Sequence, residues 1–250
     1  GTGGHASIPL PDNALVYLAK AISALGTRRL PVHVTPTTSD FINALAERQP
    51  EPMALSLRSL LNPAVTDQVL KRKIEDKKQA LIINAMLRNT ASPTILRAGE
   101  KTNVIPTQAE ADIDCRILPG QTPESLRSEL ELLLGKALSR QRDRLEVKFT
   151  RTSLPTESPP QTALTESIKK ALSRHVPQAS LVPYLVPGAT DARFLRPRGM
   201  TVYGFWPTLP QVDHATVHGL NERLPLDSFQ FALQLLWDVV TEFAGSDQQR

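Results

Sequence analysis

Apolar side chains recur at helical spacing in the first third of the chain. The stretch after Pro9–Asp12 carries apolar residues on one face of a helix that Gly26 ends; they are Leu15, Leu18, Ala19, Ile22 and Leu25. From residue 38 to residue 89 the spacing is again helical, in pieces that prolines separate. The pattern predicts one amphipathic helix and then a helical insertion at about 38–89.

Alternation with a period of two replaces this spacing between Thr94 and Ile117. The odd positions from 109 to 117 are apolar and the residues between them are polar, which predicts a β-hairpin with one face toward solvent. Thr122 is the expected cap of a leucine-striped helix, and Leu145–Phe149 alternates as a further strand. If residues 1–7 end a strand, the order is β, α, helical insertion, β, β, α, β, as in a ferredoxin-like βαββαβ domain.

The second half of the chain alternates helices with apolar strands. Three prolines in residues 154–161 predict a crossing between two domains, 1–153 and 154–250. The elements expected after it are a helix at about 161–175, strands at 181–186 and 200–205, and a final helix capped at Asp227 or Ser228. Two strands are too few for a covered sheet. The predicted fold class is therefore α/β, with an α+β ferredoxin-like domain followed by part of an α/β layer.

Composition narrows the class of protein and of partner. The chain has 250 residues, 40% hydrophobic and 22% charged, and no apolar run of membrane-spanning length, so we expect a globular domain without a membrane partner. The net charge of +4 comes from scattered arginines and aromatic residues make up only 5%, a pattern that argues against a nucleic-acid partner. A single cysteine, Cys115, excludes an internal disulfide and favours the cytoplasm.

Several polar residues are candidates for chemistry, each with a plain structural alternative. His214 and His218 lie four residues apart, but β-branched neighbours and Gly219 disfavour a metal-binding helix; His218 is then either one ligand of a dispersed metal site or a surface histidine. The loop Gly188–Asp191 follows a predicted buried strand, where α/β sheets bind ligands, or it simply caps a short helix.

The predicted hairpin adds a second pair of candidates. Asn103 follows its turn and Arg116 projects from its polar face, so the two can together hold a carboxylate, or form only a turn and a surface ion pair. The opening stretch GTGGHAS raises a separate question, because it sets His5 directly behind glycines where a chain end would fray.

Four segments of the sequence occur in an order that identifies a family. They are GTGGHAS, GEKTNVIPTQAEADIDCRILPGQTPE, VPGATDARFLRPRGMTVYGF and VHGLNERLPLDSF. Together they resemble the di-zinc metallopeptidases that include aminoacylases, acetylornithine deacetylases, glutamate carboxypeptidases and dipeptidases. The resemblance implies a ferredoxin-like lid, which often forms the dimer, inserted into an α/β catalytic domain that holds two zinc ions.

The same resemblance implies that this chain is a fragment. Residues 1–153 would be the lid and residues 154–250 the second half of the catalytic domain. The His-x-Asp motif, the bridging aspartate and the Glu-Glu pair of the family's first half are missing from the sequence. At most a partial zinc site is therefore expected in this chain, and the chain alone is expected to be inactive.

The resemblance also implies a role for each candidate residue. His218 is similar to the last zinc ligand, and His5 to the lid histidine that reaches the active site of a partner subunit and stabilises the oxyanion. Asn103 and Arg116 match positions that bind the substrate carboxylate in some members, and a motif near the substrate pocket contains two further residues, Asp191 and Arg193. The implied activity is zinc-dependent hydrolysis of N-acyl amino acids or short peptides with a free carboxylate, by a homodimer. The alternative is a non-catalytic dimerisation or binding module that retains the lid fold.

Overall fold

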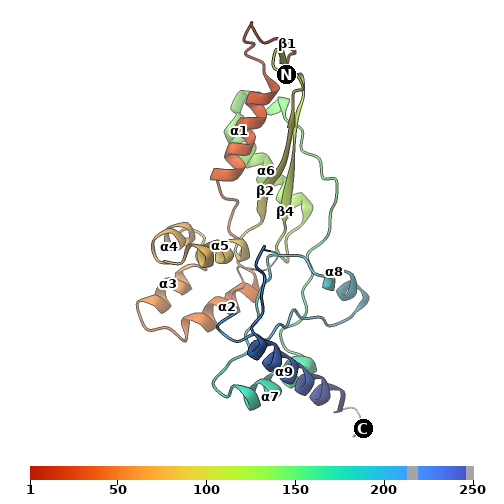
Figure 1. Cartoon of the computed structure of the whole chain (residues 1–250). Helices are drawn as coiled ribbons and strands as arrows, with labels where there is room; N and C mark the ends of the chain where they lie inside the picture. The colour runs from red at the N-terminus through yellow and green to blue at the C-terminus, as the bar shows by residue number, and fades with distance from the viewer. Residues whose placement is uncertain (213–218, 246–250) are drawn as a thin grey trace. The chain divides into compact units, whose positions relative to one another are not determined.

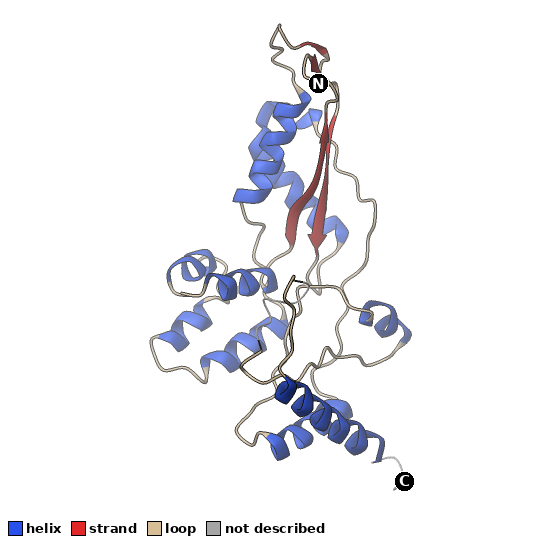
Figure 2. Ribbon diagram, in the orientation of Figure 1, coloured by secondary structure: helices blue, strands red, loops and turns tan. Residues whose placement is uncertain are grey.

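The computed structural model describes residues 1–212 and 219–245 (Figures 1 and 2). The chain divides into two compact units, Gly1–Glu157 with Tyr184–Arg193, and Ser158–Pro183 with Phe194–Arg250. The first unit contains the whole segment that the sequence assigns to a lid. No helix in the described ranges combines the length and apolar character that crossing a membrane requires.

The first unit is built on a long antiparallel hairpin that two helices cover. Strand β2 (Thr90–Ala98) pairs with β4 (Ala109–Arg116), and helices α1 (Ala14–Thr27) and α6 (Pro123–Leu138) pack beside it (Figure 1). Their shared core consists of Ala21, Ala24, Leu30, Leu126, Leu130, Leu133 and Leu134. The predicted hairpin and both predicted helices are therefore confirmed.

Local capping explains where these two helices begin. The Asn13 side chain accepts a hydrogen bond from the Leu15 amide at 3.0 Å and starts α1. Thr122 and Ser125 form a reciprocal capping box at the start of α6, the cap that the sequence predicts at Thr122. Each cap satisfies an amide that the helix itself leaves without a partner.

The strand predicted at Leu145–Phe149 does not form. After the 3-10 helix η1 (Ser139–Arg144) this segment has no regular secondary structure and no partner strand among the described residues, and its apolar side chains pack onto the core of the hairpin and helices. Arg127 holds it instead, through a 2.8 Å hydrogen bond to the Val147 carbonyl and a guanidinium 4.5 Å from the centre of the Phe149 ring.

The strand predicted at Leu145–Phe149 would need the first strand of the unit as its partner. In a βαββαβ sheet the last strand pairs with the first. Here the first strand, β1 (Gly4–His5), is two residues long and pairs with β3 (Val104–Ile105). The described residues thus form two separate two-stranded sheets in place of the four-stranded sheet of a ferredoxin-like lid.

The helical insertion forms as predicted and has a core of its own. It comprises α2 (Pro36–Ala46), α3 (Met53–Ser59), α4 (Thr66–Arg72) and α5 (Lys77–Met86). The buried residues that these helices share are Ile42, Ala46, Ala54, Leu57, Leu60, Val69, Leu70, Ile83 and Leu87. The insertion is therefore a small helical cluster that two chain crossings join to the hairpin and its helices.

A buried arginine ties these two crossings to the insertion. Arg88, on the returning crossing, is 3% exposed; its guanidinium donates to the Leu30 carbonyl at 3.0 Å and to Asp67 at 2.8 Å. Asp67 lies on α4 and also accepts from Arg29 at 2.7 Å. Desolvation raises the pKa of the Asp67 carboxyl, but the hydrogen bonds and charges of Arg29 and Arg88 outweigh it and lower the pKa.

A second polar cluster anchors the same crossings to α6. Glu129 of α6 contacts His33 Nε2 on the outgoing crossing and accepts a hydrogen bond from Asn89 at 3.2 Å on the returning one. Asn89, itself buried, accepts in turn from the Leu118 amide at 2.9 Å. Asn89 and Glu129 therefore both have partners, as burial requires.

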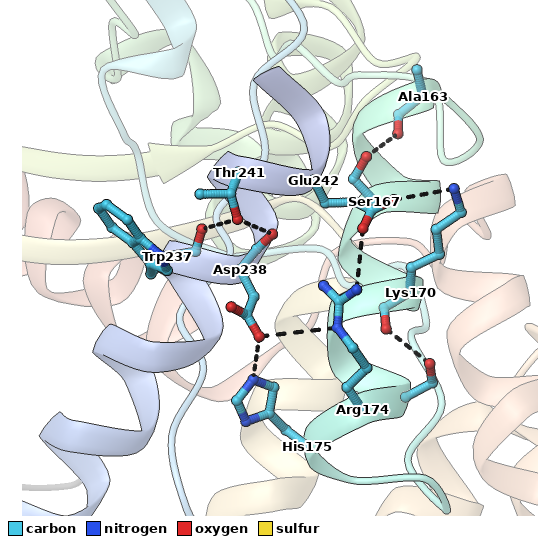
Figure 3. A network of polar contacts seen from close by, with 10 residues as sticks. Ala163, Ser167, Lys170, Arg174, His175, Trp237, Asp238, Thr241 and Glu242 are labelled. Atoms are coloured by element: carbon cyan, nitrogen blue, oxygen red, sulfur yellow. Dashed lines mark hydrogen bonds and ion pairs between the residues drawn. The ribbon is translucent and has the colours of Figure 1, made fainter. Parts of the chain in front are cut away.

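The second unit is organised by the packing of α7 (Ala163–His175) against α9 (Leu226–Gly245). Ile168 and Ala171 of α7 meet Leu235 and Val239 of α9 in a small apolar core. Figure 3 shows the polar contacts beside it: His175 bonds Asp238 at 2.8 Å, while Arg174 and Lys170 bond Glu242 at 3.1 and 3.2 Å. The two hydrogen bonds lower the pKa of the Glu242 carboxyl.

The strands predicted at 181–186 and 200–205 do not form either. Both segments lack regular secondary structure and pair with no strand of the described residues; they lie before and after the short helices α8 (Ala192–Leu195) and η2 (Arg196–Arg198). Side chains take the place of a ladder around Val202: Ser158 bonds both its amide and its carbonyl at 3.0 Å, and Arg196 donates to the carbonyl at 2.7 Å. A strand needs a neighbouring strand to complete its hydrogen bonds, and the described part of the chain supplies none for either segment.

Asp67→Ala should lower the free energy of unfolding by about 1–3 kcal/mol, because it leaves a buried guanidinium nitrogen of Arg88 without a partner. Arg29→Ala removes only the exposed partner of the same carboxylate, and we expect a loss within about 1 kcal/mol. Urea unfolding at pH 7 measures both variants, and equal losses would contradict the role given to Arg88.

The lowered pKa of Asp67 also predicts how the effect of Asp67→Ala on stability depends on pH. A carboxyl with a depressed native pKa contributes stability above its unfolded pKa and loses it as the pH falls through the native value. The stability difference between the wild type and Asp67→Ala should therefore narrow below about pH 4.

Candidate functional site

The candidate site is the tip of the first unit, where β1 meets β3. Gly4 pairs with Ile105 and His5 with Val104, and the Ala6 amide donates to the Asn103 carbonyl at 2.9 Å. The opening stretch is therefore not frayed. It is held against the loop that joins β2 to β4, and this contact brings His5 and Asn103 to one place.

Glycine is required where this stretch runs close to other backbone. A Cβ on Gly1 would lie 2.5 Å from the Ala14 nitrogen and 2.9 Å from the Asp12 carbonyl oxygen, both main-chain atoms that cannot move aside. Thr2 fixes the same approach: its amide donates to the Asp12 carbonyl at 2.8 Å and its hydroxyl to the Asp12 carboxylate at 2.7 Å. The second bond, the largest of several causes, lowers the pKa of the Asp12 carboxyl against desolvation.

Ser7 fixes the tautomer of the His5 imidazole. The Ser7 amide donates to His5 Nδ1 at 3.2 Å, and the Ser7 hydroxyl lies 2.7 Å from the same nitrogen. An amide N–H can only donate, so Nδ1 accepts and the proton of the neutral ring lies on Nε2. The His5 side chain is exposed, and Nε2 has no partner in the described residues. His5 thus presents a free N–H donor to its surroundings.

The contact of Ser7 with His5 is not among the sequence-based predictions. The signal for it is local, because a serine two residues after a histidine can return a hydrogen bond to the ring. The three residues His5, Ala6 and Ser7 carry that spacing in the sequence.

Asn103 and Arg116 are not brought together. The Asn103 carboxamide lies at the tip beside β1, exposed and without a hydrogen-bond partner in the described residues. Arg116 ends β4 opposite Thr90, about 24 Å of strand away at the usual rise per residue. The expectation that the two together hold one carboxylate is not supported within this unit.

The guanidinium of Arg116 already binds a carboxylate of its own strand. Its Nε and Nη2 donate to Asp114 at 2.6 and 2.9 Å, two residues earlier on the same face. Both side chains are nearly half exposed, so this pair contributes little to stability. A substrate carboxylate would have to displace Asp114 to bind here.

The remaining predicted site residues are Asp191 and Arg193, at or just after the Gly188–Asp191 loop, and His218. Asp191 and Arg193 are exposed, and the Arg193 amide donates to the Thr190 carbonyl at 3.2 Å at the start of α8. The Asp191 carboxylate makes no hydrogen bond or ion pair to the described part of the chain. His218, the predicted zinc ligand, and His214 lie outside the described residues.

The described residues contain no cluster that is sufficient for a metal ion. Nowhere in residues 1–212 and 219–245 do three or more histidine, cysteine, aspartate or glutamate side chains come together in a way that could hold one. The sole cysteine, Cys115, is part of the apolar face of the hairpin, and burial raises the pKa of its thiol. A reactive thiol needs a lowered pKa, so the raised pKa of Cys115 fits a side chain that packs in the core.

Comparison with known proteins identifies relatives along the whole chain. Residues 1–142 match a family model described as the peptidase dimerisation domain. Human N-fatty-acyl-amino acid synthase/hydrolase PM20D1 is 27% identical over 99% of this chain and 48% of its own length. The probable carboxypeptidase S-like 2 of Dictyostelium discoideum is 24% identical over 95% of this chain and 44% of its own. Mouse aminoacylase-1 is 29% identical over 68% of this chain and 42% of its own.

A solved structure has the same fold. The M20 family metallo-carboxypeptidase Sso-CP2 from Sulfolobus solfataricus superposes with a TM-score of 0.55 at 16% identity, over 97% of this chain and 56% of that protein. This chain spans about half the length of the curated relatives it matches. The family to which the four ordered motifs pointed is confirmed: because the dimerisation-domain match covers more than half of the residues, this chain belongs to the M20 peptidase family.

Proposed function

We propose that this chain is part of a zinc-dependent amide hydrolase that acts on N-acyl amino acids or short peptides with a free carboxylate. The names of its relatives support this substrate class, since they include an N-fatty-acyl-amino acid hydrolase, carboxypeptidases and an aminoacylase. The observation that carries the proposal is the exposed Nε2–H of His5, held beside Asn103 at the tip of the first unit.

His5 has the chemistry of an oxyanion donor. Hydrolysis of an amide builds negative charge on the carbonyl oxygen, and a fixed N–H donor stabilises that charge in the transition state. Ser7 fixes the ring so that Nε2 carries the proton, and β1–β3 pairing fixes the backbone on which the ring sits. The carboxamide of Asn103 can donate to a substrate carboxylate from the same tip. Asp191, Arg193 and Arg116 remain substrate-binding candidates, Arg116 in competition with Asp114.

In this proposal the complete protein binds zinc, and this chain would supply only part of the zinc site. His218 is the proposed ligand from this chain, and no three candidate ligands meet in the described residues. The other ligands would then belong to the half of the relatives' length that this chain does not match.

The apolar face of α9 supports the proposal that a further segment completes the second unit. Large apolar side chains remain exposed along this helix: Leu226, Phe229, Leu233, Leu236, Trp237, Val240 and Phe243. A continuous exposed apolar surface of this kind normally marks an interface. Segment 200–205 of the same unit also has no partner strand among the described residues, so both features fit a second unit that the missing part of an α/β layer would complete.

The outer edge of β2 supports a homodimer formed through the first unit. Among the described residues β2 pairs only with β4, so its other edge has no partner strand. Ile95 and Leu96 on β2 are exposed, 46% and 60% respectively. An exposed edge with apolar side chains is a ready site for pairing with another strand. A dimer would also allow His5 of one subunit to serve the site of the other.

The alternative proposal is a non-catalytic dimerisation or binding module that keeps this fold. The absence of a metal cluster from the described residues is compatible with it. The two proposals differ on the complete gene product. The hydrolase binds zinc in stoichiometric amount and releases an amino acid from an N-acyl substrate, whereas the module does neither.

In the complete protein, His5→Ala should lower turnover about 100- to 1000-fold, because it removes one oxyanion donor, while the zinc content stays unchanged. His218→Ala should lower the zinc content itself. Atomic emission spectroscopy measures the zinc content of the protein, and the rate at which free amino acid is released measures the turnover. His175→Gln serves as the control, since the His175 ring bonds Asp238 and packs against Phe231 within the second unit, and this variant should leave both readings near wild type. Equal loss of zinc in the His5 and His218 variants would contradict the assigned roles.

The same substitution at two positions of α9 tests whether this helix is covered. In this chain alone, Leu233→Ala should change the free energy of unfolding by less than about 0.5 kcal/mol, because Leu233 is 60% exposed. Leu235→Ala, at a fully buried position, should cost about 2–5 kcal/mol. In the complete protein Leu233→Ala should become clearly destabilising. If it stays neutral there, no segment covers this face.

A charge on the edge of β2 tests the proposed dimer. Leu96→Lys should raise the dissociation constant of the dimer at least about tenfold, because the charge would be buried at a strand edge. Leu55→Lys is the matched control, since Leu55 is 62% exposed on α3, away from that edge. Sedimentation velocity over a range of concentrations measures both. A dimer that responds equally to the two substitutions, or to neither, does not form through β2.

A further inference from the structure

A cavity of about 330 Å³ lies within the first unit, at the junction between the helical insertion and the hairpin with its helices. Its walls come from the crossing after α1, from the start of α4, from Arg88 on the returning crossing, and from α6. The volume falls in the range of sites that bind small molecules. The cavity is distinct from the tip that carries His5 and Asn103, because none of the tip residues lines it.

Half of the lining is apolar. The residues are Leu30, Pro31, Val32, Pro63, Leu132 and Leu133. Leu30 and Leu133 belong to the buried core, whereas Leu132, one residue earlier on α6, is 58% exposed. An apolar wall open to solvent at one side favours a ligand with a hydrocarbon part, since binding removes that surface from water.

The charged half of the lining has an excess of positive charge. Four cations, Arg28, Arg29, Arg88 and Lys136, face two carboxylates, Asp67 and Glu129. Both carboxylates are engaged already: Asp67 by Arg29 and Arg88, and Glu129 by His33 and Asn89.

Two cations are left over. Arg28 and Lys136 have no acidic partner within the described residues, so the rim of the cavity carries two charges that nothing in this unit neutralises. A concave site of one sign attracts a ligand of the other sign.

We propose that this cavity binds an amphipathic anion, with a carboxylate held between Arg28 and Lys136 and a hydrocarbon chain against Leu30, Val32 and Leu132. The guanidinium of Arg28 offers a planar pair of donors and the ammonium of Lys136 a point charge, which together suit a carboxylate. A simple inorganic anion would leave the apolar wall unused, and an amphipathic cation would meet two like charges.

The position of the cavity gives such a ligand a structural effect. Its walls come from both the insertion and α6, so an occupant contacts elements that are otherwise joined by two crossings and the Arg88 and Glu129 clusters. Binding to the native state alone stabilises that state. The proposal does not rest on the hydrolase function, because it concerns binding at residues that the reaction does not use.

The test uses laurate, at concentrations below micelle formation, as the probe of this chain in isothermal titration calorimetry. Dodecyltrimethylammonium has the same chain with the opposite charge, and inorganic phosphate has charge without a chain. Laurate should bind at one site, and both comparison ligands should bind at least about tenfold more weakly. Equal binding of the cationic detergent would show adsorption to apolar surface alone, and equal binding of phosphate would show a site for simple anions; either result overturns the proposal.

Variants locate the binding. Arg28→Gln combined with Lys136→Gln should weaken laurate at least about tenfold, because it removes both charged partners of the carboxylate. Leu132→Ser should weaken laurate but not phosphate. Lys20→Gln, an exposed lysine of α1 that does not line the cavity, and Trp237→Ser on the apolar face of α9 are the controls and should leave the affinity unchanged.

The cations also have a plain alternative role. Arg28 follows the end of α1 and Lys136 lies in the last turn of α6, where positive charge stabilises a helix terminus. A double variant that unfolds more easily in urea but binds laurate as the wild type does would assign the cations to that role only. That result would overturn the proposed site.

Discussion

The antiparallel pairing of β2 with β4 is the interaction on which the first unit depends. It runs from Thr90 opposite Arg116 to Ala98 opposite Ala109, and it gives the hairpin one apolar face for α1 and α6 to cover. The same pairing puts the connecting loop at the far end, where β3 can hold β1. The location of His5 beside Asn103, and of Arg116 at the opposite end, both follow from this one register. A slip of one residue would turn Cys115 outward and Asp114 into the core.

The helices of this chain were predictable because their signals are local. Periodicity found α1, the insertion, α6, α7 and α9, and single residues such as Thr122 marked where a helix starts. The strand predictions succeeded only where the partner lies nearby in the sequence, as in the hairpin. Leu145–Phe149 and the segments at 181–186 and 200–205 have strand-like sequences but no partner in the described residues. A strand is a property of two segments, so its pattern alone cannot decide whether it forms.

The candidate site shows the same division between local and distant information. The resemblance selected His5, Asn103 and Arg116 because they stand in the family's motifs, yet it could not tell which of them the hairpin register would bring together. That depends on their positions along β4 and on the two-residue pairing of β1 with β3. The sequence allowed a plain alternative for Arg116, in which it forms only a surface ion pair. The structure shows this ion pair, between Arg116 and Asp114.

The direction of the His5 donor limits how this tip can act. Its Nδ1 is taken by Ser7, so the ring can give only one hydrogen bond, from Nε2, and no described residue accepts it. The Nε2 donor is therefore held in one direction and stays open to solvent. The close approach of Gly1 to the backbone of Asp12 and Ala14 serves this end, because it holds β1 in a place that a larger residue would not allow. The glycines of the opening stretch therefore fix the histidine in position; they do not give it freedom.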